Sequence, residues 1–463
     1  MADRSGRFGG SNGNQRVLGS ALSAHSRFLA GTQTGRMNPT QPKNQKPNIV
    51  TPVPGPASCA LRKREDVHIA PGLQGYALMA GIAVAEARGS AITDVDGNTY
   101  LDFIGGIAVN ALGHSHPVYV KALQEQVARV SVGALTSEAR VELTERLAKL
   151  TPSPKLHRLQ LYSSGAEAVE SALRLAKCYT GKHEFVSFWG GFHGKTMGVL
   201  SLMGSRFKEK LGPMLPGSHQ VPFADCYRCP LKQPYPACSL SCVELARKQI
   251  RTSSAGAIAA IIVEPMQGTA GNVIPPRDFL PAVADLAREL GALLIADEMI
   301  TGLGRTGRNF GVDWSGVVPD IMTVGKAFGG GFPLSGIVTT DEISAARPWS
   351  HPSGSSSSYG GNPLGAMAGA TAEETEAVLT AMQRFDPVGV AARSPQECLL
   401  VQLDAFGYDD PVLIEMVRDH LEDLENKRYK PLARKFKLTL EEIKEYLDII
   451  QSLDPMPGAS YGT

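Results

Sequence analysis

The sequence predicts an α/β protein in which helices cover a mostly parallel sheet, followed by a smaller all-α module at the C-terminus. Between about residues 67 and 350, apolar runs typical of buried strands alternate with helical patterns. Strands that are apolar on both faces are typical of parallel sheets. A content of 43% hydrophobic and 20% charged residues fits a folded chain rather than a disordered or fibrous one.

The strand and helix patterns follow one another along the chain. Apolar runs predict buried strands at 156–164, 183–189, 255–265 and 291–298, and helical spacing predicts helices at 167–181 and 277–290. Ligands of such sheets bind at the carboxyl ends of the strands. We therefore expect the functional residues to follow these apolar runs.

The N-terminal segment, residues 1–60, differs from the rest of the chain. It is rich in Ser, Gly, Asn, Gln and Pro, and Asp3 is its only acidic residue. This composition predicts a disordered tail, with a targeting segment as the alternative. The α/β domain is then expected over 61–375.

Three features between these elements carry chemistry. The turn Ser164-Gly165-Ala166 follows a strand and opens a helix, where backbone N–H groups can hold an anion. Asp297 closes an apolar run, and Lys326 stands between another run and a glycine-rich turn. Each has an ordinary explanation: an empty turn, a structural carboxylate, and a lysine that reaches water.

Taken together, the three features predict a site for pyridoxal 5'-phosphate. Lys326 would form a Schiff base because a desolvated lysine becomes nucleophilic. Asp297 would pair with the protonated pyridine nitrogen, and the turn would hold the phosphate. Lys326 and Asp297 are the predicted catalytic residues.

Longer motifs resemble one enzyme family. The segments WGGFHGKTMG, VEPMQGTAG, ADEMITGLGRTG, DIMTVGKAFGGGFPLSG and SSSYGGNPLGAMAGA are similar to those of class III, fold type I pyridoxal-phosphate aminotransferases, over about 67–374. The resemblance implies transamination between an amine or ω-amino acid and a 2-oxo acid. Thr269 stands where the ornithine and 4-aminobutyrate enzymes carry Glu, which argues against those two specificities.

The resemblance also implies roles for further residues. Phe192 would stack on the pyridine ring with His193 beside it, and Glu264 would orient the surroundings of the cofactor. Met299 would lie under the ring, where Val is usual. Ser358 would reach the phosphate of the other subunit, which implies a homodimer.

Four of the seven cysteines lie close together in the sequence. Cys226, Cys229, Cys238 and Cys242 form C-x-x-C and C-x-x-x-C pairs around a Pro-rich gap of eight residues. This spacing suits four thiolate ligands of zinc or of an iron–sulfur cluster. The alternative is four reduced thiols in an inserted loop.

The last segment, 376–463, changes to helical patterns without buried strands. Asp410 and Thr439 are predicted helix N-caps, the latter with Glu442 in a capping box. The stretches EAVLTAMQRFDPVGVAARSPQECLLVQL and LDIIQSLDPMPG resemble the core-binding region of sigma-54-type factors, over about 376–458. The resemblance implies core RNA polymerase as a partner. Sequence-specific DNA binding is not expected, because the DNA-reading parts of that family do not follow.

Three hypotheses therefore stand. The first is an aminotransferase whose usual C-terminal small domain is replaced from about residue 375; aminomutase or decarboxylase chemistry on the same site stays open. The second is a polymerase-binding protein with a vestigial enzyme half, and an inactive chimera is a third possibility. A net charge of +1 and the lack of an apolar run near 20 residues predict a cytoplasmic chain without membrane partners.

Overall fold

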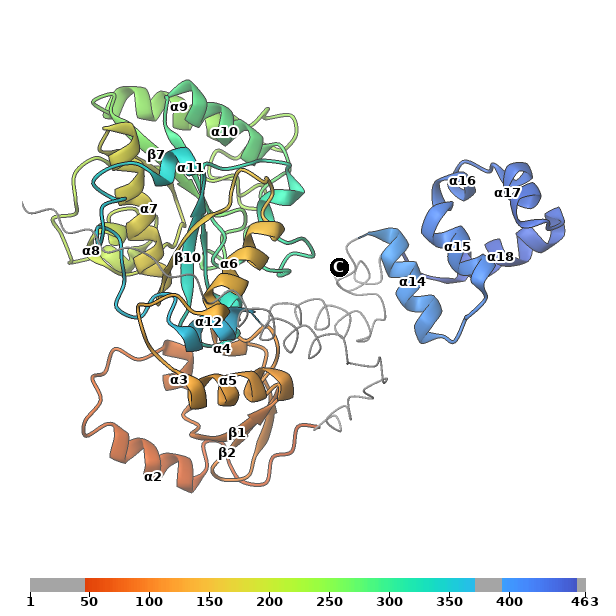
Figure 1. Cartoon of the computed structure of the whole chain (residues 1–463), viewed down its shortest axis with the longest axis horizontal. Coiled ribbons are helices and arrows are strands. Elements are labelled where there is room, and N and C mark those ends of the chain that lie inside the picture. The colour runs from red at the N-terminus through yellow and green to blue at the C-terminus, as the bar shows by residue number, and fades with distance from the viewer. Residues whose placement is uncertain (1–45, 371–393, 456–463) are drawn as a thin grey trace, which may run out of the picture.

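The computed structural model of the chain describes residues 46–370 and 394–455 (Figure 1). Most of the predicted tail lies outside these ranges, as do the expected domain junction near residue 375 and the first helical pattern after it. Residues 46–60 are described, and they contain a bridge from Asn48 to Thr99 and the start of helix α2 (Pro56–Glu65). Ordered structure therefore begins before residue 60.

The described part of the chain contains a seven-stranded sheet with the order β4-β10-β9-β8-β7-β5-β6. Its strands are β4 (Arg158–Tyr162), β5 (Glu184–Phe188), β6 (Ser218–Val221), β7 (Ile258–Val263), β8 (Leu293–Asp297), β9 (Ile321–Val324) and β10 (Ser335–Thr339). The run β6-β5-β7-β8-β9 is parallel, whereas β10 pairs antiparallel with both β9 and β4. The prediction of a mostly parallel α/β sheet is confirmed.

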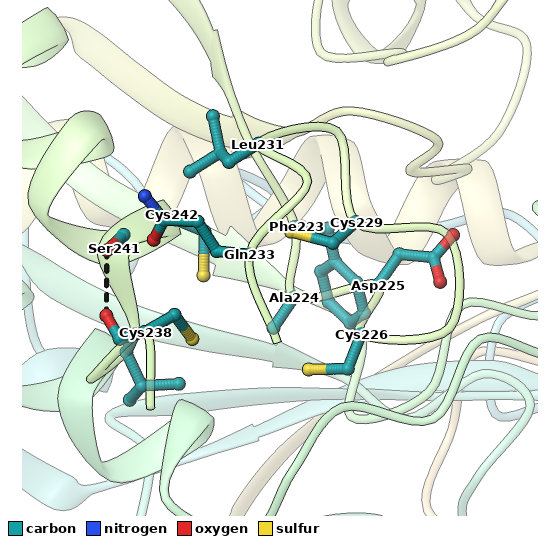
Figure 2. Close-up of a pocket in the computed structure, with 11 residues that line it drawn as sticks. Phe223, Ala224, Asp225, Cys226, Cys229, Leu231, Gln233, Cys238, Ser241 and Cys242 are labelled. Atoms are coloured by element: carbon teal, nitrogen blue, oxygen red, sulfur yellow. Dashed lines mark hydrogen bonds between the residues drawn. The ribbon is translucent and has the colours of Figure 1, made fainter. Parts of the chain in front are cut away.

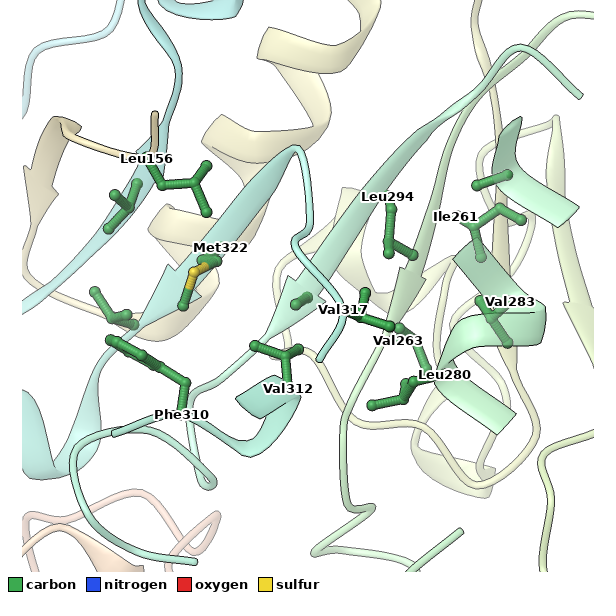
Figure 3. Close-up of a cluster of buried hydrophobic side chains, with 14 of the residues drawn as sticks. Leu156, Ile261, Val263, Leu280, Val283, Leu294, Phe310, Val312, Val317 and Met322 are labelled. Carbon is green, nitrogen blue, oxygen red and sulfur yellow. The ribbon is translucent and has the colours of Figure 1, made fainter. Parts of the chain in front are cut away.

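Successive side chains of the central strands pack into two hydrophobic cores, one on each face of the sheet. On β7, Ile261 and Val263 face one core, and Ile262 faces the other. Helix α10 (Phe279–Glu289) packs on the first face through Leu280 and Val283, which lie beside the β7 side chains in Figure 3. Burial on both faces explains why the strands read as unbroken apolar runs.

The second face of the sheet is covered by α7 (Gly165–Thr180). Helix α7 begins with a capping box at Ser164 and ends at Gly181, which has a φ of +69°. Further helices surround the sheet: α5 (Pro117–Arg129), α6 (Glu138–Leu150), α8 (Met197–Leu200), α9 (Ser241–Ser253), α11 (Asp341–Ser344) and α12 (Pro363–Ala370). Short 3-10 turns are η1 (Arg206–Lys208), η2 (Gly311–Trp314) and η3 (Lys326–Gly329).

A small antiparallel sheet precedes this domain in the chain. It consists of β1 (Val84–Arg88), β2 (Ala91–Asp94) and β3 (Thr99–Leu101), with the short helices α3 (Gly75–Ala80) and α4 (Gly105–Ala108) before and after it. Asn98 joins it to the segment before α2, because its side-chain oxygen accepts the N–H groups of Val50 and Thr51.

The C-terminal module is all-helical within the described residues 394–455, as predicted, and has its own hydrophobic core. Its helices are α14 (Pro395–Ala405), α15 (Pro411–Asp419), α16 (Leu421–Glu425), α17 (Tyr429–Phe436) and α18 (Leu440–Ser452). Asp410 caps α15 and Thr439 caps α18, which confirms both predicted caps. Helices α15 and α16 are separated at His420, where φ is −132° and ψ is 15°.

Within the described ranges, no helix has the length and apolarity that a bilayer-spanning segment requires.

Candidate active site

Asp297 is the last residue of β8 and is buried together with His193. The His193 Nδ1 lies 2.6 Å from one carboxylate oxygen, and the Thr323 hydroxyl donates to the other over 2.9 Å. Burial would raise the pKa of Asp297, but the hydrogen bond and charge of His193, with the Thr323 hydrogen bond, hold it below its usual value. The carboxylate therefore stays ionised in a dry site.

His193 is the hydrogen-bond partner of this carboxylate. Burial would lower the pKa of His193, but the hydrogen bond and charge of Asp297 raise it above the usual value. The two side chains thus form a hydrogen-bonded pair shielded from solvent, which is an ion pair when His193 is protonated. Such a pair orients the carboxylate, which can then face a cationic ring nitrogen.

Lys326 follows β9 after a single glycine and opens the turn η3. Its backbone has a φ of +48°, in the region that favours glycine. Burial lowers the pKa of the Lys326 amine, the charges of Asp297 and Glu264 oppose this, and the charge of Arg305 adds to it. The amine is thus half-buried among both acids, as a nucleophilic lysine requires.

Glu264 directly follows β7 and is buried beside the same groups. Its Oε1 accepts the backbone N–H of Phe192 over 2.9 Å, which ties the loop carrying Phe192 and His193 to the sheet. Burial raises the pKa of Glu264 to about 7; the charge of His193 opposes this and that of Asp297 adds to it. This carboxyl positions the loop.

The turn before α7 offers donors to an anion. The first N–H groups of the helix, those of Gly165 and Ala166, have no partner within the helix. The Ser163 hydroxyl is buried without a hydrogen-bond partner among the described residues. Glu167 already accepts the N–H groups of Ser163 and Ser164, each over 3.0 Å. An unpartnered hydroxyl at the N-terminus of a 16-residue helix fits a phosphate group.

Met299 connects this turn to the lysine. A Cβ placed on Gly165 would lie 3.1 Å from the Met299 sulfur, and one on Gly325 would lie 2.5 Å from it. The Met299 side chain therefore packs between the turn before α7 and the residue before Lys326. Side chains at either glycine would fill this space.

The two remaining predicted residues lie at the margin of the site. Phe192 is half-buried and packs edge-on against Phe207, with ring centroids 5.6 Å apart. Ser358 is exposed, while the neighbouring Ser357 hydroxyl lies 3.3 Å from Glu167. The stacking role of Phe192 and the intersubunit role of Ser358 stay predictions.

The structure adds two residues that the sequence did not single out. Thr323 donates to Asp297, but in the sequence it is one polar residue inside an apolar run. Glu298 is buried behind Asp297 and accepts the N–H groups of Gly311 and Val312. Only its place after Asp297 could have drawn attention to it.

The four cysteines line one small cavity near the start of α9 (Figure 2). All are free thiols, and Cys242 packs into the main hydrophobic core, where burial raises its pKa to about 11. Across the described residues, no set of three or more His, Cys, Asp or Glu side chains is arranged to hold a metal ion. The described residues therefore do not show the predicted zinc or iron–sulfur site at Cys226, Cys229, Cys238 and Cys242: the four thiols share a cavity, and Cys242 also packs into the hydrophobic core.

A family model described as aminotransferase class-III matches residues 74–392, more than half of the chain. The chain belongs to the class III aminotransferase family. A second model, the core binding domain of sigma-54 factor, matches residues 359–463. The two resemblances inferred from the sequence are therefore confirmed.

Individual relatives differ in the activity that their names state. Acetylornithine aminotransferase of Methanopyrus kandleri is 37% identical over 298 residues, which is 64% of this chain and 70% of the relative. Leucine/methionine racemase of Thermococcus litoralis is 35% identical over 304 residues, 64% of this chain and 68% of the relative. An (S)-enantioselective omega-transaminase from Thermomicrobium roseum superimposes with a TM-score of 0.64 at 31% identity, covering 75% of this chain and 80% of that one.

Proposed function

We propose that the chain is a pyridoxal-phosphate enzyme that transfers an amino group from an amine or an amino acid, including ω-amino acids, to a 2-oxo acid. The observation that carries this proposal is that Glu264, Asp297 and Lys326 stand at the carboxyl ends of the neighbouring parallel strands β7, β8 and β9. When bound, pyridoxal phosphate supplies an electrophilic carbon and a ring that accepts the electrons of a broken C–H bond.

Different residues of the chain would have different roles in this reaction. Asp297 holds a fixed negative charge toward the ring nitrogen, and His193 keeps that carboxylate oriented. The Gly165 and Ala166 N–H groups and the Ser163 hydroxyl would hold the phosphate. The Lys326 amine, with its pKa lowered by burial, would accept the proton that leaves the substrate carbon and hold it until it is returned.

The test is the absorption of the purified protein after addition of pyridoxal phosphate. The wild type should gain a visible band, and borohydride should then fix one cofactor mass on the tryptic peptide that contains Lys326. Lys326→Ala should show neither signal. A wild type that stays colourless and unmodified would end this proposal.

Racemase chemistry is the competing reaction, because one of the relatives carries that activity. The two are distinguished by the products from a single-enantiomer amino acid. Transamination requires a 2-oxo acid and yields a new amino acid, whereas racemisation yields the other enantiomer without an acceptor.

We further propose that the enzyme is a homodimer in which Ser358 contacts the phosphate bound by the partner. The exposure of Ser358 and of large apolar side chains such as Phe103 and Leu135, 92% and 86% exposed, supports this arrangement. Light scattering should give twice the mass of one chain. Ser358→Ala should weaken cofactor binding without changing that mass; a monomer that binds cofactor normally would contradict it.

A second function is favoured by the C-terminal match. We propose that residues 376–463 bind core RNA polymerase, since the sigma-54 core-binding model covers this segment and its described part has a core of its own. The full chain immobilised on beads should retain purified bacterial core polymerase, and a chain truncated after residue 375 should not. Equal retention by both would refute it.

A further inference from the structure

Helix α17 of the C-terminal module, which lies away from α14 in Figure 1, carries a row of cations. Its residues Leu432 and Phe436 pack into the module core. Lys430 and Arg434 are exposed four residues apart, and the exposed Lys437 follows three residues later at the C-cap. This spacing of i, i+4 and i+7 places side chains along one side of a helix. Lys430, Arg434 and Lys437 form the basic stripe.

The basic residues on the other side of α17 already have acidic partners. Arg428, directly before the helix, pairs with Asp423 at 3.2 Å, and Lys435 pairs with Glu415 at 2.7 Å. No residue of the basic stripe forms an ion pair with any residue in the described part of the chain. The segment 427–437 contains neither Asp nor Glu. The basic stripe is therefore a local excess of positive charge on an ordered helix.

The composition of the basic stripe favours a nucleic acid over a protein as its partner. Tight protein interfaces bury apolar or aromatic side chains at their centre, and proteins that bind single strands stack the bases on exposed aromatic rings. The two aromatic residues of α17, Tyr429 and Phe436, are half-buried and pack against the module core instead. A row of cations without such rings fits the phosphates of a duplex.

The length of the basic stripe also matches a duplex. From Lys430 to Lys437 the chain advances by seven residues, which is about 10 Å at the rise of an α-helix. Phosphates of one DNA strand follow one another at about 3.4 Å along the duplex axis. Three cations on one side of the helix can therefore lie along about three phosphates, and the helix holds them in a row before DNA binds.

We propose that the basic stripe binds the phosphate backbone of double-stranded DNA without reading its sequence. Phosphate contacts fix the position of a protein on a duplex but carry no base information. This contact is separate from the proposed amino-group transfer, and it gives the module a second partner besides core polymerase. Cations in the last turn of a helix also stabilise its end, but that role would not affect DNA binding.

The test is the fluorescence anisotropy of a short labelled DNA duplex of mixed sequence, titrated with the full chain at several salt concentrations. The wild type should bind at low salt, because each neutralised phosphate releases counterions. Lys430→Ala/Arg434→Ala should lower the slope of log affinity against log salt by about 2 and weaken binding by about tenfold. Lys430→Gln/Arg434→Gln should repeat this loss, since it removes the same charges.

The matched control is Arg418→Ala/Lys444→Ala. It removes two exposed cations from α15 and α18 of the same module, outside the basic stripe. The control should keep the slope of the wild type. Binding through other basic residues of the chain is the same in both double variants, so the difference between them reports on the basic stripe.

Several outcomes would overturn the proposal. A wild type that leaves the duplex unbound at low salt excludes it, as does a stripe variant that keeps the wild-type slope. Equal losses in the stripe and control variants would show that net charge alone attracts DNA. Stripe variants that bind DNA normally but no longer retain core polymerase would show that the stripe contacts an acidic protein surface instead. Tighter binding of an RNA duplex than of the DNA duplex would exclude DNA as the preferred partner.

Discussion

Gly325 offers a direct test of the packing that joins the anion-binding turn to the lysine. A Cβ at this position would lie 2.5 Å from the Met299 sulfur and 3.4 Å from the Ser335 Cβ. Normal contacts begin near 3.5 Å, so Gly325→Ala requires the sulfur to move by about 1 Å. Overpacking of this kind costs about 2 kcal/mol, or a lowering of the Tm by roughly 4 °C.

Removal of the Met299 side chain should relieve this overpacking. Met299→Ala alone should cost about 1–2 kcal/mol, because a half-buried side chain is lost. The double variant Met299→Ala/Gly325→Ala should be no less stable than Met299→Ala, since the Met299 sulfur that would meet the new methyl group is gone.

Thermal unfolding of the cofactor-free protein, followed by circular dichroism, measures all variants. Gly133→Ala is the control, because nothing lies within 4 Å of its added Cβ. Backbone strain does not confuse the result, since Gly325 has an extended φ of −178°. The reasoning is refuted if Gly325→Ala melts with the wild type, or if the losses of the two single variants simply add.

Three further changes test other contacts. Thr323→Val removes the donor to the buried Asp297 carboxylate and should lower the urea unfolding free energy by about 1–2 kcal/mol; an unchanged midpoint would contradict the geometry. Because the folded pKa of Glu264 is raised from 4.5 to about 7, its contribution to stability is present at low pH and is lost as the pH rises between these values. This loss of unfolding free energy, up to about 3 kcal/mol, should be smaller in Glu264→Gln. If the variant and the wild type have the same pH profile of stability, the raised pKa is contradicted. Asp410 accepts the N–H groups that open α15 and the Tyr446 hydroxyl, so Asp410→Ala should cost about 1–2 kcal/mol of local stability, seen as faster amide exchange in that helix; unchanged exchange would show that the cap is dispensable.

Much of the sheet could be predicted because its strands are buried on both faces. The apolar run 183–189 became β5 (Glu184–Phe188), and the helical spacing over 277–290 became α10 (Phe279–Glu289). Asp297 and Lys326 could be found because each stands directly after such a run. The antiparallel direction of β10 could not, since an apolar run does not record which strand lies beside it.

The contacts within the site were harder to predict than its residues. Thr323 looks like any polar residue of a strand until the neighbouring strand brings the Asp297 oxygen to 2.9 Å. For Cys242, the sequence spacing predicts a metal ligand, but in the structure its side chain packs into the hydrophobic core. The break between α15 and α16 at His420 could not be predicted either, because buried apolar residues continue on both sides of it.

The left-handed backbone of Lys326 sets activity against stability at a single position. With a φ of +48°, the chain would fold with less strain if glycine or asparagine stood there. Neither residue brings an amine to the acids around it. Lys326 therefore places its amine near these acids at a cost in local backbone stability.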